Sequence, residues 1–106
     1  MAEPDGKPYK VCYSQATLDE LEGLAASATS LGMAGEFLEA LKLINEKLTF
    51  DPLAWGDPQY RLPALGLLIC HGITSMLHVY YGVNEEHHLV FVKEILPLPN
   101  SLLGNE

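Results

Sequence analysis

The sequence predicts a single α+β domain in which a helical hairpin packs on one face of a small antiparallel sheet. Three observations predict this class. A short segment in which apolar and polar residues alternate comes first. Two segments with apolar residues at helical spacing follow, and three segments rich in branched and aromatic residues come last. Strands that follow one another along a chain usually pair, so the last three are expected to form a meander.

The first two elements are expected between residues 9 and 32. Aromatic or apolar side chains alternate with polar ones over residues 9–14, which predicts a short strand. Thr17 and Glu20 match a capping box, in which the threonine hydroxyl would accept from the backbone N–H of Glu20. Leucine and alanine then recur at helical spacing, so a first helix is expected to end near residues 30–32.

A second amphipathic helix and a loop are expected next. The apolar stripe of this helix is formed by Phe37, Leu38, Leu41, Ile44 and Leu48. Residues 50–63 contain three prolines, and both Asp-Pro pairs disfavour helix at the aspartate. We therefore expect a structured loop there, held in place by Trp55 and Tyr60.

Strands are expected over residues 65–69, 76–83 and 89–95, with turn signals between them. In the middle strand the more apolar face should turn toward the helices; it is formed by Leu77, Val79, Tyr81 and Val83. His78 and Tyr80 would then project to the opposite side. The last strand is less decisive, because Leu89, Phe91 and Ile95 share a face with Lys93, while Val90 and Val92 share the other face with His88 and Glu94.

The domain is expected to span residues 9–99. Residues 1–8 combine prolines, a glycine and charges, which is typical of a flexible N-terminal arm. Prolines end the last strand, so residues 100–106 are expected to form a C-terminal tail.

The charge balance excludes one class of function. The chain has 6 Lys and Arg against 14 Asp and Glu, a formal net charge of −8. A protein that follows a nucleic-acid backbone gathers basic residues on one face, because contacts to phosphates supply its affinity. Direct binding to free nucleic acid is therefore not expected.

Targeting signals are absent from the sequence as well. No apolar run approaches the roughly 20 residues of a membrane-spanning helix, so no membrane association is expected. Residues 1–6 lack the basic and apolar regions of a signal peptide. We therefore expect a cytoplasmic protein in which Cys12 and Cys70 are reduced thiols.

Three stretches of sequence carry a family resemblance. They are Tyr-x-Val-x-Tyr-Ser followed by an Asp-Glu-Leu helix, Asp-Pro-Gln-Tyr-Arg-Leu at residues 57–62, and His-Val-Tyr-Tyr-Gly-Val-Asn-Glu-Glu-His-His-Leu-Val-Phe-Val at residues 78–92. With the order strand, helix, helix and three strands, the chain resembles the RelE/ParE superfamily of small bacterial toxins over residues 9–99. The resemblance implies neutralisation by an antitoxin protein whose segment wraps the helices and a sheet edge.

The resemblance also indicates candidate catalytic residues. Members that cut mRNA in the ribosome hold Lys and Arg on the open face of the sheet, because the developing phosphorane needs positive charge and proton donors and acceptors. The corresponding positions here are Arg61, His71 and His78, with Tyr80 beside them. After Lys93 the segment carries no base. The basic cluster is therefore largely absent.

We therefore expect a toxin-family protein that acts mainly by binding an antitoxin and a cellular target. One alternative is a ribosome-dependent mRNA endoribonuclease that uses Arg61, His71 and His78. Another is a non-toxic regulatory module that forms a homodimer. The residues expected to contact an antitoxin or a second copy are Leu31, Met33, Leu98, Leu102 and Leu103, which the helix and strand patterns do not need.

No cofactor is expected. Residues 85–88 read Glu-Glu-His-His, but neighbouring residues of a hairpin turn point in different directions and no third ligand stands at a defining spacing. This segment is expected to be a solvated turn, and no metal site is expected.

Overall fold

The computed structural model describes residues 7–98. Its elements are β1 (Lys10–Tyr13), α1 (Gln15–Ser30), α2 (Ala34–Phe50), α3 (Pro52–Trp55), β2 (Asp57–Leu62), the 3-10 turn η1 (Pro63–Leu65), β3 (Leu67–Ile73), β4 (Leu77–Asn84) and β5 (Leu89–Pro97). The α+β class and the helical hairpin are confirmed. Residues 1–6 of the expected arm and the whole expected tail, residues 100–106, lie outside the described residues.

The five strands form one mixed sheet in the order β1-β5-β4-β3-β2. Strands β2 to β5 are an antiparallel meander, but β1 runs parallel to β5 and pairs Lys10 with Leu89. The sheet is therefore not purely antiparallel. A tight turn fixes neighbouring strands as antiparallel, whereas β1 reaches its partner through the rest of the chain, so no turn sets its direction.

Residues 50–63 do not form the expected loop. They contain the short helix α3 and the edge strand β2. Pro52 is the first residue of α3. Proline lacks a backbone N–H, but the first residues of a helix make no intrahelical hydrogen bond through that group, so proline is tolerated there. Pro58 lies in β2, and a bulge at the following residue separates it from Tyr60 in the register. An edge strand tolerates both features because only one side of it is paired.

Helix α1 begins earlier than the capping box predicted. Ser14 is the N-cap, and its hydroxyl accepts from the backbone N–H of Thr17 at 3.1 Å. Thr17 is itself inside the helix and buried, with its hydroxyl 3.4 Å from the carbonyl oxygen of Lys93 in β5. The capping role therefore belongs to Ser14, and Thr17 anchors the first turn of α1 to the sheet.

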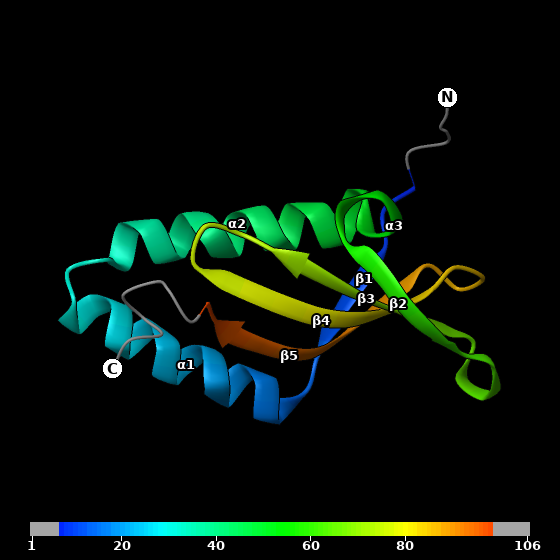
Figure 1. Cartoon of the computed structure of the whole chain (residues 1–106), viewed down its shortest axis with the longest axis horizontal. Coiled ribbons are helices and arrows are strands. Elements are labelled where there is room, and N and C mark those ends of the chain that lie inside the picture. The colour runs from blue at the N-terminus through cyan, green and yellow to red at the C-terminus, as the bar shows by residue number, and fades with distance from the viewer. Residues whose placement is uncertain (1–6, 99–106) are drawn as a thin grey trace.

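Helix α2 lies along one face of the sheet, and α1 lies beside it near β5 (Figure 1). The buried side of α2 is formed by Phe37, Ala40, Ile44 and Leu48. Leu38 is 52% exposed, so it does not belong to the buried stripe. The β4 face predicted to meet the helices is confirmed, since Leu77, Val79, Tyr81 and Val83 are all buried.

A bulge in β5 explains the unclear pattern of the last strand. Tyr80 pairs with Glu94 while Tyr81 pairs with Val92, so Lys93 is an extra residue on β5. The extra residue reverses the alternation. Ile95 consequently joins Val92 in the core, where both are buried, and Lys93 and Glu94 are exposed.

Candidate functional site on the open face

The face of the sheet that the helices leave uncovered is called the open face. It carries Tyr60, Ile69, His71, His78, Tyr80, Glu94 and Leu96. The register places His71 opposite Tyr80, and Tyr80 opposite Glu94. Residues that oppose each other in paired strands project to the same side, so these side chains share one surface.

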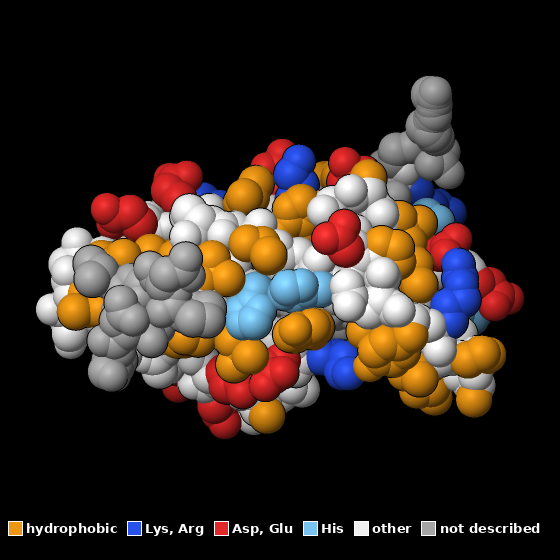
Figure 2. Space-filling view, in the orientation of Figure 1, with side chains coloured by type: hydrophobic (Ala, Val, Ile, Leu, Met, Phe, Trp, Pro, Cys, Tyr) orange, Lys and Arg blue, Asp and Glu red, His pale blue; other side chains and the backbone are white. Residues whose placement is uncertain are grey.

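His71 and His78 meet in the middle of the open face. His71 Nε2 lies 3.0 Å from His78 Nδ1, within hydrogen-bonding distance, and the two rings meet edge to face. The ring of Tyr80 stacks on His71 with centroids 4.4 Å apart. Figure 2 shows histidine side chains side by side at the centre of this face, with hydrophobic side chains around them. Three of the four predicted catalytic residues are therefore in contact.

The environment of His78 disfavours a second positive charge. Burial lowers the pKa of His78 below its ordinary value, and the nearby His71 lowers this pKa further, while Glu94 opposes the shift. In a hydrogen bond between two neutral imidazoles, one ring donates and the other accepts. The pair can therefore hold and pass a proton, which is the chemistry of a general acid and base.

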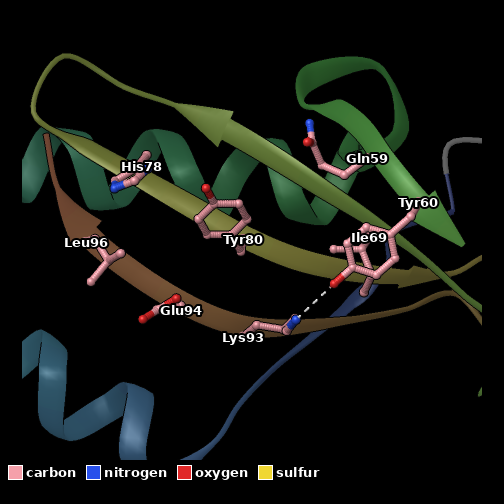
Figure 3. Close-up of a pocket in the computed structure, with 8 residues that line it drawn as sticks. All are labelled: Gln59, Tyr60, Ile69, His78, Tyr80, Lys93, Glu94 and Leu96. Atoms are coloured by element: carbon pink, nitrogen blue, oxygen red, sulfur yellow. Dashed lines mark hydrogen bonds between the residues drawn. The ribbon is translucent and has the colours of Figure 1, made fainter. Parts of the chain in front are cut away.

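A cavity of about 450 Å³ adjoins His78 of this pair (Figure 3). It is lined by Gln59, Tyr60, Ile69, His78, Tyr80, Lys93, Glu94 and Leu96. The ammonium group of Lys93 donates to the hydroxyl of Tyr60 at 3.4 Å. This contact joins β5 to β2 across the intervening strands, where Ile69 faces Gly82 and no side chain of Gly82 stands in the way.

Arg61 lies away from the histidines. It pairs with Leu68, whose side chain packs against the core, so Arg61 projects to the side opposite Tyr60. It lines a second cavity together with Glu85 and Glu86. The structure thus separates Arg61 from His71 and His78, and places it near carboxylates.

Six of the eight residues that line the cavity were not among the predicted site residues, namely Gln59, Tyr60, Ile69, Lys93, Glu94 and Leu96. Tyr60 was expected in a loop, and the bulge that exposes Lys93 and Glu94 has no clear sequence signal. Lys93 alone had a signal, because it is the only base in the last strand segment.

The predicted partner-binding residues fall into three groups. Leu31 caps the C-terminal end of α1 and is 46% exposed. Met33 and Leu98 are half-buried; Met33 packs against the core, and the backbone N–H of Leu98 donates to the carbonyl of Met76. Leu102 and Leu103 lie outside the described residues.

The remaining candidate groups are structural. The turn after β4 is held by Asn84, whose side chain accepts from the backbone N–H of His87, and by His88, which stacks on Tyr9. Both cysteines are free. Within residues 7–98, no three or more His, Cys, Asp or Glu side chains are grouped so as to hold a metal ion, and no helix is long and apolar enough to cross a membrane.

Comparison with known proteins supports the fold. No protein-family model matches the sequence, and no curated protein matches it either. Among solved structures, a chain from the toxin–antitoxin complex RelBE2 of Mycobacterium tuberculosis is similar, with a TM-score of 0.65 and 17% sequence identity. The match covers 92% of this chain and 100% of that chain. This chain therefore has a RelE-like α+β fold, with a helical hairpin on a five-stranded mixed sheet.

Proposed function

We propose that this chain is a toxin-family protein that acts mainly by binding protein partners, namely an antitoxin and a cellular target. The observation that carries the proposal is the charge of the open face. Lys93 is the only Lys or Arg among the residues that line its cavity, and Glu94 lies beside it. Stabilising a phosphorane requires concentrated positive charge, which this cavity does not provide.

Exposed apolar side chains on the helical layer support binding to a protein. Leu18 of α1, Leu31 at the C-cap of α1 and Leu38 of α2 are each more than two-fifths exposed. A shallow cavity between α1 and the end of β5 includes Leu24, Ile95 and Pro97 among its lining residues. Apolar surface of this kind favours an amphipathic partner segment over a charged polymer.

The proposal is tested by expressing the chain in bacteria with and without the product of the adjacent open reading frame. We expect growth arrest that the co-expressed protein relieves, with ribosome-bound mRNA left intact. The two purified proteins should form a complex that Leu31→Asp weakens. Leu65→Asp is the matched control, because Leu65 is also exposed but lies in η1, outside the helical layer.

The endoribonuclease remains the second candidate, and the contact between His71 and His78 favours it. These imidazoles could supply the proton transfers of RNA cleavage. Cuts in ribosome-bound mRNA that disappear in His78→Ala would overturn the binding proposal in favour of the nuclease. Unchanged growth together with self-association of the pure protein would contradict both and favour the dimeric regulatory module.

A further inference from the structure

The contact between His71 and His78 places two ring nitrogens at hydrogen-bonding distance inside the sheet. The two residues come from the neighbouring strands β3 and β4, which lie inside the sheet with a paired strand on each side. His71 is opposite Tyr80, and His78 is opposite Ile73, so the histidines are diagonal neighbours. Their ring nitrogens are thus held close together by strands that have little freedom to move apart.

The spacing of the nitrogens is close to that of two metal ligands. Imidazole nitrogens bind Zn²⁺ at about 2.0–2.1 Å, and tetrahedral geometry then separates two such nitrogens by about 3.3 Å. His71 Nε2 and His78 Nδ1 are 3.0 Å apart. Small rotations of the two rings would therefore aim both lone pairs at one ion.

The surrounding charges favour a cation. Glu94 is near enough to His78 to oppose the lowering of its pKa. The ammonium group of Lys93 lines the same cavity and keeps its positive charge, but it donates to the hydroxyl of Tyr60. The whole chain carries a formal charge of −8.

We propose that His71 and His78 form a two-histidine site for a divalent transition-metal ion of the Zn²⁺ or Ni²⁺ type. Because no third protein ligand is grouped with them among the described residues, water completes the coordination. The ion binds Nε2 of His71 and Nδ1 of His78, so the proton shared between these two atoms is displaced. Each imidazole then carries its proton on the ring nitrogen that does not bind the ion. The site is independent of the proposed toxin-family function.

Isothermal titration with ZnCl₂ at neutral pH tests the site. We expect one ion per chain for the wild-type protein and at least tenfold weaker binding for His71→Ala and for His78→Ala. His87→Ala is the matched control, because this exposed histidine lies in the turn after β4, and it should bind like the wild type. Absence of binding would overturn the proposal, as would binding that His87→Ala abolishes and His78→Ala keeps.

A second measurement needs only the wild-type protein. Ni²⁺ is paramagnetic, so substoichiometric Ni²⁺ should broaden the ring proton signals of His71 and His78 in NMR spectra before those of His87 and His88. Broadening that starts at His87 and His88, or affects all four histidines equally, would overturn the proposal. This result does not depend on whether the histidine variants fold.

Discussion

The buried hydroxyl of Tyr81 is expected to hold α3 on the sheet. Tyr81 is 0% exposed, and its hydroxyl donates to the carbonyl oxygen of Pro52 at 2.6 Å. The ring of Trp55, at the end of α3, lies stacked 6.0 Å from the Tyr81 ring. Tyr81→Phe keeps the ring but removes the donor, which leaves a buried carbonyl without this bond.

The expected cost follows from that loss. Leaving a buried acceptor unsatisfied destabilises a protein by about 1–3 kcal/mol, and each kcal/mol lowers the Tm of a domain of this size by about 4–8 °C. Urea unfolding followed by circular dichroism gives the free energy. Fluorescence reports α3 directly, because Trp55 is the only tryptophan in the chain. Tyr80→Phe, at a half-exposed neighbour, is the control.

The reasoning would be refuted if Tyr81→Phe cost no more than Tyr80→Phe. The pH dependence offers a second check. Burial raises the pKa of Tyr81 above its ordinary value of 10.0. The phenol is therefore easier to ionise in the unfolded chain, and its contribution to stability is complete below pH 10 and lost as the pH rises further. Stability of the wild type should fall above pH 10 more steeply than that of Tyr81→Phe.

Three further predictions concern the helices and the histidine pair. Ser14→Ala should cost about 0.5–2 kcal/mol in urea unfolding, because it removes the N-cap of α1, whereas Glu20→Ala should cost less than 0.5 kcal/mol. Leu48→Ala, at a fully buried site, should cost about 2–5 kcal/mol, and the same change at exposed Leu38 should be nearly neutral; thermal unfolding compares them. NMR titration should show His78 protonating below its ordinary pKa of 6.5, so its contribution to stability is present above pH 6.5 and lost as the pH falls; a midpoint at or above 6.5 would contradict this.

The spacing of apolar residues predicted the helices and strands that bury only one of their faces. The hairpin of α1 and α2 and the inward face of β4 follow from that pattern, because burial on one face imposes a period on the sequence. Strand β2 was missed because its prolines are tolerated only at an edge, and the sequence does not show which strand will be the edge. The bulge at Lys93 was missed because one extra residue breaks the alternation without leaving a motif.

The candidate site depends on register, which is a tertiary property. His71 and His78 were predicted on the open face of the sheet, but their direct contact depends on the pairing of β3 with β4. The turn between these strands sets that pairing. Thr74 accepts from the backbone N–H of Leu77 through its hydroxyl and donates its own N–H to the carbonyl of Leu77. A shift of the register by one residue at this turn would place one histidine on the opposite face of the sheet.

The parallel pairing of β1 with β5 has a consequence for synthesis of the chain. The first strand finds its partner only in the last strand, since Lys10 pairs with Leu89. On the ribosome, β1 and the helical hairpin emerge long before β5 does, so the sheet cannot be completed until β5 has emerged. Contacts between such distant segments slow folding, because the chain must close a long loop before they form. The open face is therefore assembled last, after the helical layer has left the ribosome.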